Sequence, residues 1–180
     1  DNVPTTMTPN QAAAQADPTN TAPINFTVVF SEAINPATFV GSDVVISGSA
    51  GGVKTCTPTT ADNITWNVAV TGMAAAGTVV ANIPIGAVAD LTGNANAVAS
   101  TSTDNTVAWD ATPPTMTINQ AAAQADPTGA SPINFTVVFS EAIAPATFVG
   151  SDVVITGSAG GVKTCTPTTA DNITWNVAVT

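Results

Sequence analysis

The most regular feature of the chain is a strict alternation of apolar and polar side chains in three segments. In residues 24–31 the apolar set is Ile24, Phe26, Val28 and Phe30, and in residues 64–71 it is Ile64, Trp66, Val68 and Val70. Residues 77–86 add Val79, Ala81, Ile83 and Ile85. Because a period of two residues places such a set on one face of a strand, each segment predicts an antiparallel strand with one buried face.

Four other segments predict shorter strands, at residues 5–10, 43–48, 53–60 and 105–110. Stretches rich in Gly, Pro, Asn and Asp separate them, and residues 33–43 leave room for one helical turn. Short strands in this number, with no convincing long helix between them, are typical of a two-sheet sandwich. The fold class is therefore predicted to be all-β, with immunoglobulin-like sandwich domains of about seven strands each.

The chain also repeats itself. A shift of 109 residues places Asp1 on Asp110 and Thr71 on Thr180 without a gap, and nine of the 71 aligned positions differ. The differences are Asn2/Ala111, Val3/Thr112, Thr5/Pro114, Pro9/Ile118, Asn20/Gly129, Thr21/Ala130, Ala22/Ser131, Asn35/Ala144 and Ser47/Thr156. Solenoid repeats have periods of only ~20–50 residues, so each copy is expected to be a domain with its own core.

Two domains follow from this repeat: a complete one at residues 1–109 and a partial one at residues 110–180. The second matches residues 1–71, so we expect it to contain about five strands and to lack the last two. Its open strand edges would accept a strand from another molecule. Two interpretations stay open: the chain is a window on a longer tandem array, or strand exchange between subunits completes the last domain.

Composition narrows the functional classes. Charged residues make up 8% of the chain and the formal net charge is −10, with two cationic side chains in total. Nucleic acids and anionic membrane surfaces both require clusters of Lys or Arg, so neither is an expected partner, and no membrane insertion is expected. The chain contains no His and no Arg, which excludes triads that use a His base. We therefore expect no enzyme.

Several strings resemble the bacterial immunoglobulin-like tandem repeats of large cell-surface and adhesin proteins. They are PINFTVVFSEAI (23–34), DVVISGSAG (43–51) and AVADLTGNANAVASTSTDNTVAWDATPPT (87–115). The resemblance implies an extracellular or cell-surface location. It also implies a structural role as part of a fibre or adhesin stalk, whose partners are neighbouring repeats or identical subunits. The alternative that it leaves open is an adhesive module that recognises a surface glycan or protein.

Acidic residues at predicted strand ends and in the linker suggest a metal site. Asp17, Glu32, Asp90 and Asp110 are oxygen donors on irregular backbone, and calcium takes ~6–8 such ligands. If these loops meet at a junction, a bound calcium ion would stiffen it. The other interpretation is that the aspartates are turn residues and that Glu32 is a solvated side chain.

The remaining candidates are cysteines, sequons and tryptophans. Cys56 and Cys165 occupy equivalent positions in the two copies, so each is either a small buried thiol or one half of an intermolecular disulfide. Asn63 and Asn172 begin Asn-x-Thr sequons in predicted turns and are candidate glycosylation sites. Trp66 and Trp175 are predicted core residues, whereas Trp109 lies beside the linker, where it could pack the joint.

Overall fold

The computed structural model describes residues 3–180 and divides the chain into two compact units, with the boundary between Thr112 and Pro113. We call them unit 1 and unit 2. Asp1 and Asn2, the first residues of the predicted domain 1–109, lie outside the described residues. The boundary falls after residue 109 because the Asp110 N–H donates to the Thr19 carbonyl at 2.8 Å and the Thr112 N–H donates to the Asp110 carboxylate at 3.0 Å. These bonds tie the start of the linker to unit 1.

The described part of unit 1, from Val3 on, contains seven strands at the positions that the alternation and the turn signals predict. They are β1 (Met7–Gln11), β2 (Ile24–Phe30), β3 (Val45–Ser47), β4 (Thr55–Thr60), β5 (Thr65–Thr71), β6 (Gly77–Asn82) and β7 (Thr106–Trp109). The helical turn expected in residues 33–43 is present as two 3-10 turns, η1 (Pro36–Thr38) and η2 (Gly41–Asp43). The strand predictions for this unit are confirmed.

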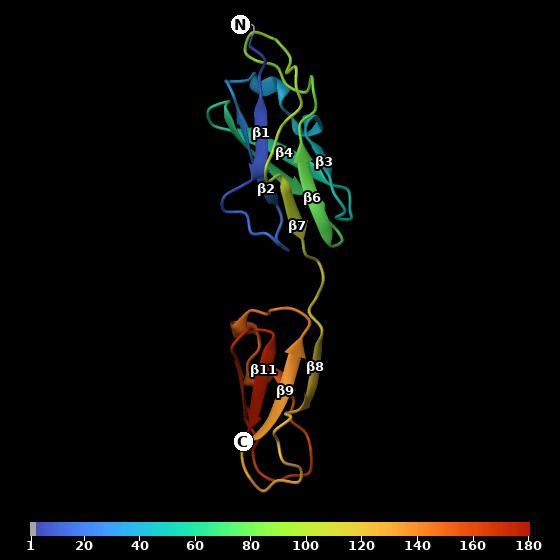
Figure 1. The fold of residues 1–180 in the computed structure, drawn as a ribbon, viewed down its shortest axis with the longest axis vertical. Helices are drawn as coiled ribbons and strands as arrows, with labels where there is room; N and C mark the ends of the chain where they lie inside the picture. The colour runs from blue at the N-terminus through green and yellow to red at the C-terminus, as the bar shows by residue number, and fades with distance from the viewer. Residues whose placement is uncertain (1–2) are drawn as a thin grey trace. The chain divides into compact units, whose positions relative to one another are not determined.

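The strands of unit 1 form two antiparallel sheets, one of order β1-β2-β5-β4 and one of order β3-β6-β7 (Figure 1). If the strands are lettered A to G in chain order, the sheets are ABED and CFG. This is the arrangement of the constant-type immunoglobulin sandwich. The predicted fold class, an all-β immunoglobulin-like sandwich, is confirmed.

The inner faces of the two sheets share one hydrophobic core. The predicted inward residues Phe26, Val68 and Val79 are fully buried in it. Phe39 stacks edge-to-face on both Phe30 and Trp66, with ring centroids 5.3 and 5.0 Å apart. Such stacks stabilise a core beyond the area that they bury, and the prediction that Trp66 is a core residue is confirmed.

Two predicted inward residues are exposed instead, Ile64 and Ile85. Ile64 precedes β5, in a turn where its N–H donates to the Asp62 carboxylate at 2.9 Å. Ile85 follows the end of β6 at Asn82, and Pro84 lacks the N–H that a longer ladder would need. In both cases the alternation of the sequence runs past the point where backbone pairing stops.

Unit 2 has four strands: β8 (Met116–Gln120), β9 (Ile133–Phe139), β10 (Cys165–Thr169) and β11 (Thr174–Val179). They form one sheet of order β10-β11-β9-β8, and Figure 1 shows β8, β9 and β11 side by side. The 3-10 turns η3 (Pro145–Thr147) and η4 (Gly150–Asp152) match η1 and η2. Residues 3–180 contain no helix with the length and apolarity needed to span a membrane.

The expected fifth strand of unit 2 is not formed. Residues 154–156 match strand β3, whose only ladder partner in unit 1 is β6. Unit 2 has no counterpart of β6, so these residues have no strand to pair with. The prediction of about five strands was therefore wrong by one, because the formation of β3 depends on β6.

Candidate functional site

Two of the predicted calcium ligands, Asp17 and Asp110, lie at one end of unit 1. The Asp17 carboxylate accepts a hydrogen bond from the Ala108 N–H at 2.9 Å. Asp110 lies beside the same loop, since its N–H donates to the Thr19 carbonyl. Both aspartates therefore help to attach the end of β7 to the loop between β1 and β2.

The other two, Glu32 and Asp90, lie at the opposite end. Glu32 lies two residues after Phe30, the last residue of β2, and its carboxylate accepts a hydrogen bond from the Thr5 hydroxyl at 2.8 Å. Asp90 forms an isolated bridge with Ile34, two residues after Glu32. Strand β2, seven residues long, separates the two ends, and at ~3.3 Å per residue this is roughly 23 Å. Unit 1 therefore does not bring the four predicted ligands to one site.

Asp90 has a different role. Its side chain is 3% exposed and accepts hydrogen bonds from the N–H and the side chain of both Asn94 and Thr92, at 2.8–2.9 Å. The bonds from Asn94, and then those from Thr92, lower the pKa of Asp90 well below its ordinary value. The carboxylate organises the turn of residues 90–94, which is the turn interpretation of this residue.

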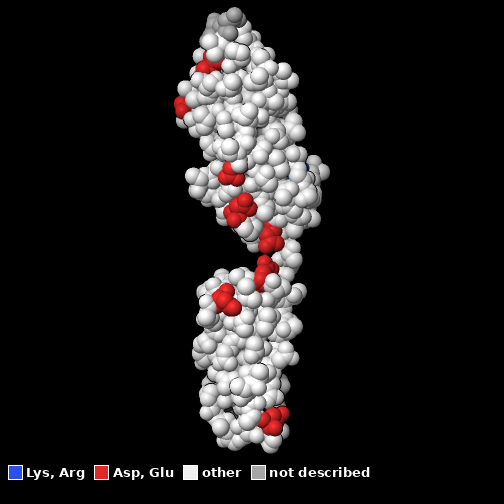
Figure 2. All heavy atoms as spheres, viewed as in Figure 1, with Lys and Arg blue, Asp and Glu red and all other residues white. Residues whose placement is uncertain are grey.

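On the face of the molecule in Figure 2, acidic side chains form small groups among uncharged residues, several of them towards the lower end of unit 1. Among residues 3–180, no three His, Cys, Asp or Glu side chains gather in a way that could hold a metal ion. The predicted calcium set therefore has no common centre within the described part of either unit.

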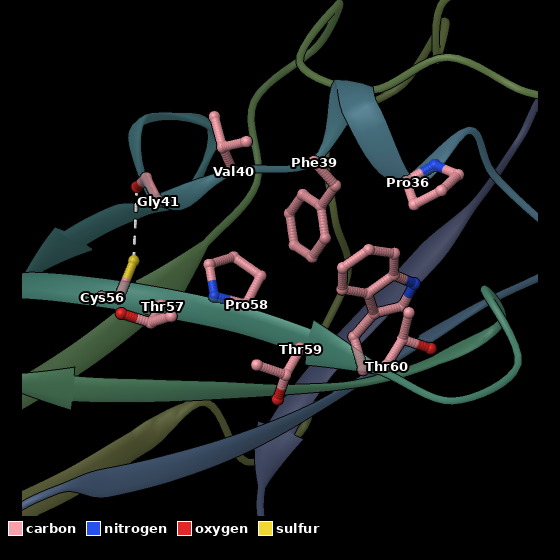
Figure 3. A pocket seen from close by; sticks show the side chains of 10 residues that line it. Pro36, Phe39, Val40, Gly41, Cys56, Thr57, Pro58, Thr59 and Thr60 are labelled. Atoms are coloured by element: carbon pink, nitrogen blue, oxygen red, sulfur yellow. Dashed lines mark hydrogen bonds between the residues drawn. The ribbon is translucent and has the colours of Figure 1, made fainter.

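The cysteines lie in a groove that occurs in both units. In unit 1 it has a volume of about 580 Å³ and lies between the η1–η2 segment and β4, lined among others by Phe39, Pro58 and Trp66 (Figure 3). The Cys56 thiol donates to the Gly41 carbonyl at 3.3 Å, the bond drawn in Figure 3. Burial, and then the nearby Asp43 carboxylate, raise the pKa of Cys56. A half-buried, protonated thiol is poorly suited to form an intermolecular disulfide.

The groove of unit 2 has a volume of about 440 Å³ and is lined by the equivalent residues, among them Phe148, Pro167 and Trp175. Its Cys165 thiol donates to the Gly150 carbonyl at 3.3 Å. Neither groove is lined by Asp, Glu or Lys. The grooves therefore offer apolar, hydroxyl, thiol and backbone groups, which suit an uncharged ligand.

A second apolar surface lies on the sheet of unit 2. Met116 is 62% exposed, whereas its counterpart Met7 is 2% exposed. Ile133 is 39% exposed, whereas Ile24 is fully buried. A groove of about 510 Å³ on this face is lined by Met116, Ile118, Val137, Phe139, Ile143 and Phe148, among others. We call this surface the open face. The repeat alone indicates where it lies, because it is the face that β6 and β7 cover in unit 1.

The sequon asparagines are turn residues. Asn63 and Asn172 have φ values of +62° and +63°, which Asn adopts more readily than most residues. The Asn63 N–H donates to the Thr60 hydroxyl at 2.9 Å, and its carbonyl accepts from the Ile34 N–H at 3.0 Å. Asp62 closes the same turn through the N–H groups of Ile64 and Thr65. Glycosylation of these asparagines stays a prediction.

The structure places Trp109 within unit 1. It is partly buried and packs against the core of that unit. The parallel bridge between Thr19 and Trp109 holds this end of β7. Its indole N–H has no hydrogen-bond partner within the described residues, and the same is true of Trp66 and Trp175.

Comparisons with known proteins identify no relative of the chain. No family model matches it, and neither the curated proteins nor the solved structures contain a match. The class of protein is therefore defined by the fold alone: a tandem immunoglobulin-like β-sandwich protein in which each unit contains its own copy of the same four-stranded sheet.

Proposed function

We propose that the chain is a structural repeat module of an extracellular fibre or adhesin stalk, to which each unit adds length. The observation that carries this proposal is the repetition of one sheet with nine differences in 71 aligned positions. A catalytic or recognition domain needs one elaborated site, whereas a spacer needs many equivalent units. The sequence resemblance to bacterial immunoglobulin-like repeats points the same way.

The link and the surface of the units support a spacer. Residues 110–115 connect β7 to β8 and include Pro113 and Pro114, which restrict the backbone. The chain has 8% charged residues and a net charge of −10, so copies repel one another and bind anionic polymers poorly.

The proposal also includes self-assembly, in which strands supplied by another chain complete an open unit.

Electron microscopy of chains that carry two, four and eight copies of residues 1–109 tests the spacer role. We expect particle length to grow by a constant step of roughly 3–4 nm per copy. The same measurement with a calcium chelator tests whether an ion stiffens the joints. Compact particles whose length does not follow the number of copies would contradict the proposal.

The paired grooves favour a second candidate, an adhesive module for an uncharged surface glycan or peptide. Both grooves have the same aromatic, proline and threonine lining, so tandem units would bind a repetitive ligand with increased avidity. A glycan array probed with the chain tests this candidate. The control is the double variant Thr59→Arg and Thr168→Arg, which blocks both grooves at exposed positions. Equal binding by both proteins would reject the grooves as the site.

A further inference from the structure

The open face of unit 2 has a covered counterpart in the same chain. In unit 1 the same sheet packs against residues of β6, β7 and their connection, among them Val79, Ala81, Ile83 and Val107, all fully buried. All of these belong to residues 72–109, the part of the repeat that occurs once in the chain. Unit 1 therefore shows which segment fits this face.

Backbone groups of unit 2 are also left without the partners that this segment supplies. In unit 1 the N–H groups of Thr19, Asn35 and Ala50 donate to the carbonyls of Ala108, Ala89 and Thr78, at 2.9–3.0 Å. The equivalent N–H groups, of Thr128, Ala144 and Ala159, donate to no protein acceptor among the described residues. A single segment, equivalent to residues 72–109, would both cover the apolar face and accept hydrogen bonds from these N–H groups.

The differences between the copies preserve this interface. Asn35 and Ala144 differ in their side chains, whereas the bond to residue 89 uses the backbone N–H. Ser47 and Thr156 differ at an exposed position, and Pro9 is replaced by Ile118, which adds apolar surface to the open face. No difference places a charge on the face.

We propose that the open face of unit 2 is a docking site for a polypeptide segment with the sequence of residues 72–109. On docking, residues Val154, Ile155 and Thr156 pair with residues 82, 81 and 80 of the segment, as Val45, Ile46 and Ser47 do in unit 1. The bound state is a second constant-type sandwich. This inference rests on the proposed function and specifies the site and the segment by which another chain would complete an open unit.

The segment must be additional to the one that unit 1 already holds. If two copies of the chain exchanged this segment, each exchange would open one face for every face that it closed, so the number of contacts would not rise. The docking partner is therefore a further copy of the segment, carried by another polypeptide.

The experiment adds a synthetic peptide of residues 72–109 to the 180-residue chain and measures two signals. The first is hydrogen exchange at Val154–Thr156, which we expect to slow by at least about tenfold as the ladder forms. The second is the oxidation of Met116 by peroxide, which we expect to fall towards the rate of Met7. Met7 is the matched internal control, because it occupies the same position under an intact cover.

A peptide with Val79→Asp and Val107→Asp is the second control, since it places two charges on the face that must be buried. A chain extended by a second copy of residues 72–109 after Thr180 supplies the same segment in cis and does not depend on peptide solubility. The proposal is overturned if neither form protects residues 154–156 and Met116, or if the charged peptide protects them equally. It is also overturned if sedimentation shows that two open faces dimerise and exclude the peptide. None of these results affects the spacer role, which the length measurement tests separately.

Discussion

At the scale of single residues, three aspartates of this chain, Asp62, Asp90 and Asp171, accept hydrogen bonds from backbone N–H groups in their own turns. Asp62 and Asp171 each accept hydrogen bonds from the N–H groups two and three residues further on and from a threonine hydroxyl. Asp90 accepts bonds from Asn94 and Thr92. These bonds lower the pKa of all three carboxyl groups. A carboxylate that is bonded in this way holds a turn closed without an ion.

The acid stability of unit 1 should depend on Asp90. Its pKa is lowered in the folded state, so its contribution to stability is present above the unfolded pKa of about 4 and is lost as the pH falls towards the folded pKa. We expect Asp90→Asn to lower the melting temperature at pH 7 and to weaken the pH dependence of stability below pH 4. Thermal melts between pH 2 and pH 7 measure this.

The control for that experiment is Asp104→Asn, because Asp104 is exposed and its carboxylate accepts no hydrogen bond among the described residues. If the two variants have the same acid profile, the hydrogen bonds at Asp90 do not provide the acid-sensitive stability.

The Cys56 thiol should be alkylated more slowly than a fully exposed cysteine thiol. Burial and Asp43 raise the pKa of its thiol, and only the thiolate reacts with alkylating agents. In the variant Cys165→Ser, we expect alkylation of Cys56 at pH 8 to be at least about tenfold slower in the folded than in the unfolded protein. Mass spectrometry over time measures the rate. Rapid formation of a disulfide-linked dimer by this variant would instead support the intermolecular bridge.

At the scale of elements, each strand of the second sheet depends on its neighbours. β3 has three residues and pairs only with β6, and residues 154–156 form no strand where β6 is missing. The turn after β3 also packs closely against β6. Gly48 has φ +100°, and a Cβ on it would lie 2.2 Å from the Thr78 carbonyl oxygen.

Gly48 and its counterpart Gly157 therefore form a matched pair. Gly157 also has a positive φ, of +123°, but a Cβ on it would meet no atom within 4 Å. Gly157→Ala should cost about 1 kcal/mol through backbone strain alone. Gly48→Ala should cost roughly 2–4 kcal/mol, since strain and steric overlap with β6 add. Chemical denaturation of both variants measures the difference, and equal costs would mean that the turn moves away from β6 without penalty.

Elements were also the level at which sequence reasoning worked best. Alternation of apolar and polar residues predicted three strands of unit 1, because a strand with one buried face has a period of two residues in its sequence. The four shorter strands were predicted from short segments between turn signals. The pattern does not reveal where pairing stops, so Ile64 and Ile85 were misplaced. It also treated residues 154–156 as autonomous, although strand formation there depends on a partner distant in the sequence.

The candidate sites were harder to predict than the strands. The open face follows from the repeat, because sequence identity transfers the packing of unit 1 onto unit 2. The grooves beside Cys56 and Cys165 were missed, because their walls come from η1, β4 and β5, which are separated in the chain. The four predicted calcium ligands all lie near strand ends or in the linker. The alternation pattern does not show at which end of the sandwich a strand ends, so it could not show that the four residues lie at two opposite ends.

At the scale of the whole molecule, the chain contains an internal comparison between one sheet with a cover and the same sheet without it. Nine of 71 aligned residues differ, so the intrinsic exchange rates of most amides are the same in both copies. Differences in protection therefore report burial and cooperativity.

Equivalent amides should exchange faster in unit 2 than in unit 1. Phe26 is fully buried in unit 1, whereas Phe135 is partly buried in unit 2, and the smaller core stabilises its sheet less. We expect protection in β9 to be at least about 100-fold weaker than in β2, which corresponds to roughly 2.7 kcal/mol. Hydrogen exchange of the intact chain measures every pair at once. Equal protection would mean that the sheet is stable without its second layer.

The lengths of the connections are related to the order in which a sheet and its cover occur along the chain. Five residues, 72–76, join β5 to β6, and both strands meet this loop at the same end of unit 1. Six residues, 110–115, join β7 to β8, so the next four-stranded sheet begins only after the cover of unit 1 has ended. Strands β6 and β7, which cover the four-stranded sheet of unit 1, therefore follow that sheet in the chain, and synthesis from the N-terminus completes the sheet before its cover.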